Sequence, residues 1–569
     1  MINTALLNKA VPAFACLLVI SWFIRKLYPK PYPGIPYNKR SANRITGDIP
    51  DLVPLLKATN EFSDPLFTVT TQKLGTPIAQ FLFPGIRRPF IVLEDPREIE
   101  DILMRRNKEF DVAPMAVEMY GPMFPYAMVA QYSTPELKAQ KRLWADAVKS
   151  EFLRATAAPN VHKATLELLH LWRLRASQQT QPFYILDDLK NSALDAIWVS
   201  AVGENPGMVQ YEIEKLKRQT AGGSSPDGRP QAEPLGAFIK REVTYIAENI
   251  SRNSNSISPK LAQIWESYTP RFRRCRTTVQ AEVGRALAKA VERFQGLDSE
   301  ALEAKDTCMM DLVLRRQMHD AARTGGTPKD PTKDLRMCDT LFTMLVAGYD
   351  STANTLSWFA KFMETNQHVQ SELRSTLRAA FSDSMPSVDE ILGTEVPYLD
   401  GTCEETLRLA GTAKAQLRQA VVDTEILGCR VPKGAQVFLN LHINRAPHPV
   451  DELKRSASSQ TAGAKLGDGL QTYASRDVAA FEPRRWLTKD GKTGRDIFNP
   501  YAMPSLAFGG GLRGCPGRKL AEMEIRIAIV LIILNFEFLP LPDELRTTTA
   551  AERIFRRPDT PYARLKILC

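Results

Sequence analysis

The chain has 569 residues, of which 44% are hydrophobic and 24% are charged, a composition typical of a globular protein with a large core. Its formal charge of +10 favours contact with acidic partners or anionic surfaces, but no arginine-rich block, zinc-finger spacing or RNP-type motif favours nucleic acid. Eight scattered cysteines without a Cys-x-x-Cys pair indicate no disulfide framework and predict a reducing compartment.

The N-terminal segment is apolar over Ala10–Ile24 and is followed directly by Arg25 and Lys26. A cleaved signal peptide is the alternative, but no small-residue cleavage site follows and the cationic flank lies after the apolar segment. The positive-inside rule then places the rest of the chain in the cytosol. We therefore predict a single-pass signal anchor over 1–28 and a stiff proline-rich hinge over 29–37.

The next elements in chain order are one hairpin and a long helical region. The stretch Phe81–Val92 reads as a small β-hairpin around Pro84-Gly85. Apolar residues at helical spacing then run from about Pro135 to Glu300, interrupted by a predicted surface loop at Ala221–Gly236. A second long helix is predicted over Asp334–Thr365.

The C-terminal third is predicted to be mixed. A helix runs through Glu404–Leu409, and strands are expected at Ala420–Val422 and Gln436–Leu439. The polar segment 452–477 reads as a solvated surface insertion. The whole of 38–569 is therefore predicted to be one large domain, mainly α with small β-sheets.

The stretch Phe508–Gly517 places Cys515 among glycines at the start of a long apolar helix. Glycines allow a backbone to fold closely around a bulky partner, and a helix N-terminus favours thiolate over thiol. A structural cysteine in a turn is one alternative. A dinucleotide loop is another, since Gly509-x-Gly511-x-x-Gly514 precedes Glu537 by about 20 residues, but Asn499–Ser505 contains two prolines and is a poor strand.

Two other patterns have ordinary explanations when taken alone. Glu405 and Arg408 share a helix face, as a surface ion pair would. Gly348 lies within a predicted helix, where glycine costs about 1 kcal/mol relative to alanine, so close helix packing would explain it.

Four motifs together, at 347–352, 405–408, 481–486 and 508–517, resemble those of the cytochrome P450 family in the family's order. The general layout looks like that of membrane-anchored, microsomal members of fungal specialised metabolism. The resemblance implies the cytochrome P450 fold and haem b (iron protoporphyrin IX) as cofactor. Cys515 would be the axial thiolate of the haem iron and Arg513 would bind a haem propionate, with Phe508 and Gly517 as fixed positions of the same loop.

The resemblance also assigns residues on the oxygen side of the haem. Gly348 would make room for dioxygen, and Asp350 with a neighbouring hydroxyl would relay the protons that O–O cleavage requires. Ser351 stands where the family usually has threonine, and Thr352 follows it. Because the rotamer of serine is less restricted, the coupling of oxygen consumption to product is the property that this replacement affects.

Further residues are assigned to support of the haem. Glu405 and Arg408 would lock to Arg485 and buttress the haem loop. Arg142 matches the arginine of a W-x-x-x-R motif that reaches a propionate, with Lys138 in place of the tryptophan. Arg418 is placed like another propionate-binding arginine of the family.

The implied function is a monooxygenase that inserts one oxygen atom of O2 into a lipophilic small molecule, such as a terpenoid, polyketide or alkaloid. Electrons would come from a separate NADPH–cytochrome P450 reductase, with cytochrome b5 as a further donor, at the endoplasmic reticulum membrane. The alternatives are a haem-thiolate isomerase or dehydratase that rearranges a peroxide without reductase, and a non-catalytic, membrane-tethered haem protein. The sequence predicts no nucleic-acid partner.

Overall fold

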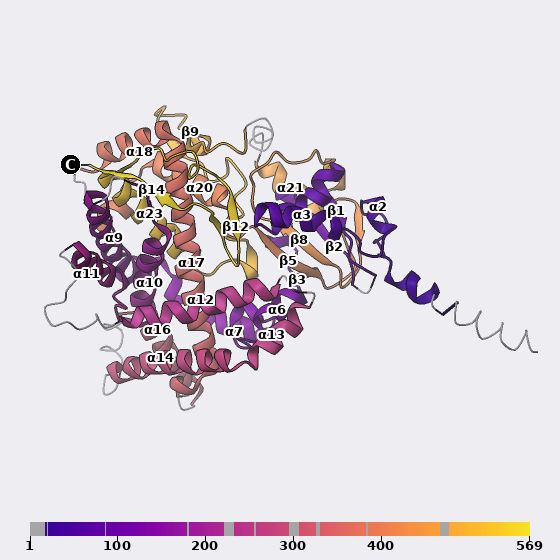
Figure 1. Cartoon of the computed structure of the whole chain (residues 1–569), viewed down its shortest axis with the longest axis horizontal. Helices are drawn as coiled ribbons and strands as arrows, with labels where there is room; N and C mark the ends of the chain where they lie inside the picture. The colour runs from indigo at the N-terminus through magenta and orange to yellow at the C-terminus, as the bar shows by residue number, and fades with distance from the viewer. Residues whose placement is uncertain are drawn as a thin grey trace, which may run out of the picture. The chain divides into compact units, whose positions relative to one another are not determined.

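The computed structural model describes residues 18–19, 21–85, 87–178, 181–220, 233–254, 256, 258–294, 307–325, 330–382, 385–466 and 477–568. The chain divides into two compact units (Figure 1). The first unit comprises Met1–Ala113, Ala415–Leu441 and Ala446–Gly467. The second, helical unit comprises Pro114–Lys414, His442–Arg445 and Asp468–Cys569. The domain boundaries predicted from the sequence stay a prediction.

The first unit is built on a five-stranded sheet of order β1-β2-β8-β5-β3. Its strands β1, β2 and β8 are buried along nearly their whole length, as expected for runs of apolar residues covered on both faces. Only the β2–β8 pair is parallel in this sheet. The strand bounds are β1 Ile78–Phe81, β2 Phe90–Leu93, β3 Phe110–Val112, β5 Ala415–Ala420 and β8 Gln436–Asn440, with the separate hairpin β6 Thr424–Ile426 and β7 Cys429–Val431.

The helices of the first unit are short. They are α2 Lys39–Ala42, α3 Ile49–Thr59, α4 Ser63–Phe67, the π-helical turn η1 Thr68–Gln72, α5 Pro96–Met104, the 3-10 turn η6 Glu452–Lys454 and α21 Ala457–Leu466. In α5 the Asp95 side chain accepts a hydrogen bond from the Glu98 N–H and caps the first turn, with Pro96 at the first helical position. These start signals are those expected from the sequence Asp-Pro.

Three strand predictions fall in this unit, and one is corrected. The strand predicted over Gln436–Leu439 is confirmed as β8. The predicted hairpin is confirmed, since β1 and β2 pair antiparallel from Ile78–Leu93 to Phe81–Phe90. The predicted strand over 420–422 is wrong beyond Ala420, where β5 ends. Its neighbours β8 and β3 begin opposite Gln419 and Ala420, so neither strand runs on beside Val422, which is 44% exposed.

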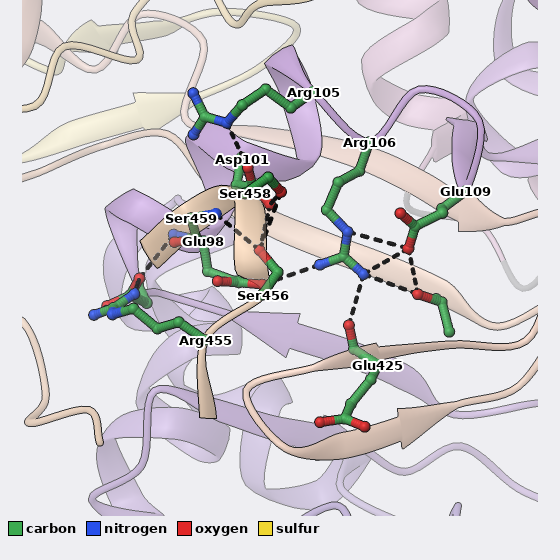
Figure 2. A network of polar contacts seen from close by, with 12 residues as sticks. Glu98, Asp101, Arg105, Arg106, Glu109, Glu425, Arg455, Ser456, Ser458 and Ser459 are labelled. Atoms are coloured by element: carbon green, nitrogen blue, oxygen red, sulfur yellow. Dashed lines mark hydrogen bonds and ion pairs between the residues drawn. The ribbon is translucent and has the colours of Figure 1, made fainter. Parts of the chain in front are cut away.

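The first part of the segment 452–477 packs on α5 (Figure 2). Residues 467–476 lie outside the described residues. The Arg455 guanidinium pairs with Asp95 at 2.5 Å and is buried. Asp101, which is fully buried, accepts hydrogen bonds at Oδ2 from the hydroxyls of Ser456 at 2.6 Å and Ser458 at 2.8 Å. Charged and hydroxyl side chains thus attach this polar segment to the helix, although Leu453 remains 87% exposed.

The second unit is mainly helical. Its principal helices are α6 Pro114–Tyr120, α7 Pro135–Leu143, α9 Ala158–Gln178, α10 Leu186–Val202, α11 Met208–Thr220, α12 Leu235–Ser254, α13 Pro259–Ser267, α14 Pro270–Phe294, α16 Met309–Thr324, α17 Leu335–Thr365, α18 Gln367–Ala380, α19 Val388–Gly393, α20 Pro397–Ala410 and α23 Arg518–Asn535. Four two-stranded sheets accompany them: β4 Phe183–Tyr184 with β14 Tyr562–Ala563, β9 Leu487–Lys489 with β10 Asp496–Phe498, β11 Phe536–Phe538 with β15 Leu565–Ile567, and β12 Ala550–Glu552 with β13 Arg556–Pro558.

The long helix predicted over 334–365 is confirmed as α17. Asp334 is its N-cap, with its carboxylate accepting from the N–H groups of Arg336 and Met337. α17 lies beside α10 within the helical unit (Figure 1), and both contribute to one large apolar core together with α9, α20 and α23. The long apolar helix predicted after Cys515 is also confirmed and is α23.

Some predictions fall outside the described residues. Most of the predicted anchor 1–28 lies there, and no helix in the described ranges combines the length and apolar character needed to cross a membrane. Residues 221–232 of the predicted loop lie there as well, while Leu235 and Gly236 already belong to α12. Glu537, the acid of the dinucleotide alternative, lies in strand β11.

Candidate functional site

The loop 508–517 closes tightly around Cys515. The Cys515 N–H donates to the Phe508 carbonyl at 2.9 Å. Gly509 and Gly511 have φ of +61° and +60°, in the left-handed region that side chains disfavour. Gly511–Arg513 forms a 3-10 turn, η8, and Gly517 is the N-cap of α23. The glycines are therefore required by the backbone that presents the cysteine ahead of the helix.

Lys141 on α7 is the lysine that reaches this loop. Its ammonium donates to the carbonyl of Leu512, three residues before Cys515. Lys138, which sequence comparison with the family selects, is exposed one turn earlier on the same helix. Both lie in the run Lys138-Ala-Gln-Lys-Arg142, and the sequence offered no signal to decide which of the two turns toward the cysteine.

The cysteine is accessible, and the loop stabilises its thiolate only in part. Cys515 as a residue is exposed, although protein atoms surround its sulfur closely enough to raise the pKa of the thiol. The Gly517 backbone N–H and the Lys141 ammonium lower that pKa and oppose the effect. The loop thus supplies part of the stabilisation of a thiolate, and a bound metal cation would supply more.

The other predicted cofactor-binding residues fall into two groups. Arg142 is exposed on α7, and Arg513 lies in η8 next to the cysteine; both belong to the helical unit. Phe508 packs on the apolar core, with the Arg518 guanidinium 5.7 Å from its ring centre. Arg418 belongs to the first unit, where it is buried on β5 and donates to Gln416 Oε1 at 2.7 Å.

Glu405 is the centre of a buried network that includes Arg408 and Arg485, the two arginines that the family resemblance assigns to it. Its carboxylate accepts from Arg408 at 2.7 and 2.8 Å, from Arg485 at 2.8 Å and from the Trp486 indole N–H at 2.9 Å. Arg408 also donates to the carbonyls of Ile443 and Val478. The carboxylate is fully buried, so these bonds hold α20 to the 3-10 turn η7 (Pro483–Trp486) in a structural role.

Gly348 on α17 is explained by packing against α10. A Cβ added at this position would lie 2.9 Å from Ile197 Cγ1 and 3.2 Å from Ile197 Cδ1. The absence of a side chain therefore lets two helices approach, which is the ordinary explanation for the residue. A role in making room for dioxygen stays a prediction.

Asp350 forms an ion pair that the sequence did not reveal. Its Oδ1 lies 2.7 Å from Lys190 Nζ of α10, and both side chains are largely buried. Burial alone would lower the pKa of the Lys190 ammonium, but the Asp350 carboxylate outweighs it, so that pKa is raised. Lys190 precedes Asp350 by 160 positions in the chain, and no local pattern links the two.

The two hydroxyls that follow Asp350 have different partners. Ser351 Oγ donates to the Ala347 carbonyl of its own helix at 2.6 Å and lies at a partly exposed position. Thr352 Oγ1 donates at 3.0 Å to Glu524 Oε2 on α23. The Thr352 hydroxyl is thus engaged with another helix, which leaves Ser351 as the hydroxyl better placed to exchange partners.

Removing Lys190 should destabilise the helical unit measurably. Lys190→Met would leave the Asp350 carboxylate buried without its counter-ion, and we expect a loss of about 2–3 kcal/mol in the free energy of unfolding. Denaturant unfolding of the purified protein measures it. Asp350→Asn in the same background should restore part of the loss, and a Lys190→Met protein as stable as wild type would contradict the pairing.

Comparison with known proteins identifies the family. The family model described as Cytochrome P450 matches residues 64–445 and 477–563. The chain belongs to the cytochrome P450 family. It is 29% identical to the cytochrome P450 monooxygenase TRI13 of Fusarium sporotrichioides, covering 97% of this chain and 98% of that protein. It is also 29% identical to the cytochrome P450 monooxygenase GME11363 of Pestalotiopsis microspora, over 100% and 99% of the two chains.

A solved structure shows the same fold. The crystal structure of a cytochrome P450 (CYP102L1) superposes with a TM-score of 0.65 at 18% identity, covering 95% of this chain and all of the other. The predicted cytochrome P450 fold, mainly helical with small sheets, is therefore confirmed. As a member of this family the protein is a monooxygenase whose cofactor is haem iron.

The residues present fit a haem. Cys515 offers one soft sulfur donor from an exposed position in the loop. In the described ranges no group of three or more His, Cys, Asp or Glu side chains could hold a metal ion. A porphyrin brings its own nitrogen ligands, so a haem needs only one sulfur from the protein. Arg513 and Arg142 are cations suited to haem carboxylates.

Proposed function

We propose that this P450 inserts one oxygen atom of O2 into a lipophilic secondary metabolite, using haem b and electrons from a separate NADPH–cytochrome P450 reductase. The observation that carries the proposal is a single-cysteine loop at the start of α23 together with the Asp350–Ser351 segment on α17, two helices in direct hydrogen-bond contact. The fungal relatives named as cytochrome P450 monooxygenases support the reaction class.

Bound haem supplies the oxygen-activating redox chemistry. The chain contributes the sulfur of Cys515 as ligand, and the Glu405 network keeps α20 and η7 rigid in the same unit. Asp350, held by Lys190, would take up a proton from solvent and pass it to the Ser351 hydroxyl, which would release its own proton toward the oxygen side of the haem. That hydroxyl now bonds the Ala347 carbonyl and can turn from it without breaking a contact between helices. Arg513 and Arg142 would hold the haem carboxylates.

The location belongs to the same proposal. The apolar segment Ala10–Ile24, followed by basic residues, would anchor the protein in the endoplasmic reticulum membrane with its catalytic unit in the cytosol. Such an anchor favours lipophilic substrates that partition into the membrane, such as terpenoids, polyketides or alkaloids, and a membrane-bound reductase, with cytochrome b5 as a further donor.

The deciding experiment measures the dependence of turnover on reductant. The full chain in membranes is supplied with candidate lipophilic compounds, with and without NADPH and reductase, and with an organic peroxide in their place. We expect an oxygenated product only with O2, NADPH and reductase. Full turnover of a peroxide without reductase would establish an isomerase or dehydratase instead, and haem binding with no turnover of any compound would favour a haem carrier.

The Ser351 hydroxyl should control how efficiently NADPH is used. Ser351→Ala removes the hydroxyl while leaving Cys515 and its loop unchanged, so haem binding should be intact. We expect product formed per NADPH to fall by roughly threefold to tenfold, since water can replace part of a missing proton relay. The measurement is product against NADPH consumed. Unchanged coupling would mean that water alone carries the proton past this position.

A further inference from the structure

Thr352 is directed differently from the other hydroxyl side chains around it on α17. Ser351, Thr355 and Ser357 each donate to the carbonyl four residues earlier in the same helix, at 2.6, 2.9 and 2.8 Å, and Thr355 also contacts the Thr412 hydroxyl at 2.8 Å. The Thr352 hydroxyl instead crosses to Glu524 of α23. A hydroxyl that satisfies its own helix adds little to tertiary structure, whereas this one ties two helices together.

Glu524 is an unusual partner because it is buried without a counter-ion. It is 5% exposed, and in the described part of the chain no Lys, Arg or His forms an ion pair with its carboxyl. Burial raises its pKa to about 7, although the hydrogen bond from Thr352 acts in the opposite direction. Burying a carboxyl without a counter-ion costs desolvation free energy that one hydrogen bond offsets only in part. An apolar residue in the same space would avoid that cost.

The two residues lie at positions that matter for the proposed function. Glu524 is nine residues after Cys515, in the second turn of the helix that begins directly after the cysteine loop. Thr352 directly follows Ser351 and is two residues after Asp350. Their hydrogen bond is therefore a direct link between the helix that follows the proposed thiolate ligand and the helix segment that carries the proposed proton relay.

We propose that Glu524 is a positioning residue for the Asp350–Ser351 segment, acting through its hydrogen bond to Thr352. The proposal rests on the proposed monooxygenase function. Rotation of α17 about its axis sets where the Ser351 hydroxyl points, and two polar contacts add to the apolar packing of the helix in holding that rotation at this segment. Lys190 of α10 holds Asp350, and Glu524 of α23 holds Thr352, with Ser351 between them.

The experiment uses the full chain with haem bound and a double-mutant cycle. Thr352→Val and Glu524→Leu each remove the bond, and we expect each to lower product per NADPH by about threefold to tenfold, the effect of one buried hydrogen bond. The carbon monoxide spectrum should stay unchanged. The double variant should be no worse than either single one, and Thr352→Ser and Glu524→Gln, which keep a bond, should restore most of the coupling. If Glu524→Leu does not fold, the comparison of product per NADPH between Thr352→Val and Thr352→Ser tests the proposal instead, with a loss expected only in Thr352→Val.

A matched control and a second readout make the result specific. Ser357→Ala removes a fully buried hydroxyl that bonds only its own helix, and coupling should be unchanged. At a pH below 7 the infrared spectrum should contain a neutral carboxyl band that is lost in Glu524→Gln and shifted in Thr352→Val. Additive losses in the double variant, or no infrared shift in Thr352→Val, would overturn the proposal.

The cycle also separates this inference from the proposed function. Thermal unfolding of the same four proteins reports the Thr352–Glu524 coupling without any turnover. If wild type shows no reductase-dependent product, the proposed function fails, and non-additive unfolding temperatures still support the link between the helices. Additive unfolding temperatures overturn it whatever the activity.

Discussion

Cys515→Ser abolishes the thiolate-type carbon monoxide difference spectrum of the reduced protein. Serine keeps the size of the side chain, and the Cys515 N–H bond to Phe508 does not involve the sulfur, so the loop should still close. What is lost is the soft donor, because a hydroxyl is a poor ligand for haem iron and is not deprotonated at neutral pH. We expect complete loss of the signal, measured by difference spectroscopy on purified protein.

Two other cysteines provide the controls. Cys403 lies on α20, where burial strongly raises the pKa of its thiol. Cys429 lies on β7, and its thiol donates a hydrogen bond to the Gly34 carbonyl at 3.5 Å. Both are structural in these surroundings. Cys403→Ser and Cys429→Ser should keep the spectrum. If Cys515→Ser keeps it too, the sulfur ligand comes from another residue.

Glu405→Ala should prevent the protein from accumulating with haem. The substitution leaves buried donors on Arg408, Arg485 and Trp486 without their acceptor, and two of these are cations. Breaking a buried charged network by removing one partner costs about 3–5 kcal/mol, a large part of the roughly 5–15 kcal/mol that stabilises a typical protein. The readouts are soluble yield and the fraction of protein that gives the thiolate-type carbon monoxide spectrum.

A variant of the neighbouring Glu404 is the control that distinguishes loss of the Glu405 network from the loss of any negative charge on α20. Glu404 precedes Glu405 on α20, and its carboxylate accepts only from the Ser505 hydroxyl at 3.0 Å among the described contacts. Glu404→Gln should therefore yield nearly normal haem protein, and Glu405→Gln should fall between the two. Wild-type yield and spectrum for Glu405→Ala would show that α20 and η7 do not need this carboxylate.

The parts of the site that could be predicted from the sequence are those specified locally. The glycines at 509 and 511 require backbone angles that only glycine adopts easily, so the loop around Cys515 is encoded within ten residues. Glu405 and Arg408 lie on one helix face because of their spacing of three residues. Asp334 is an N-cap residue type at the position where α17 begins. The membership of Arg485 in the network came from the family resemblance, and the structure bears out its contact with Glu405.

The parts that could not be predicted depend on how helices are rotated and packed. Lys138 and Lys141 differ by three positions, and only the orientation of α7 decides which reaches Leu512. Lys190 and Glu524 contact α17 from two other helices, each more than 150 positions away in the chain, with no spacing rule to connect them. Such contacts are fixed by tertiary packing, which overrides local preference.

The contact between Gly348 and Ile197 means that these two positions must change together. A methyl group at 348 would meet the isoleucine side chain at 2.9 Å, so Gly348→Ala alone forces α17 and α10 apart. Shortening residue 197 would make the space again. A selection for revertants of Gly348→Ala should therefore recover substitutions at Ile197, and variant libraries that randomise α17 around position 348 will be richer in folded members when position 197 is varied as well.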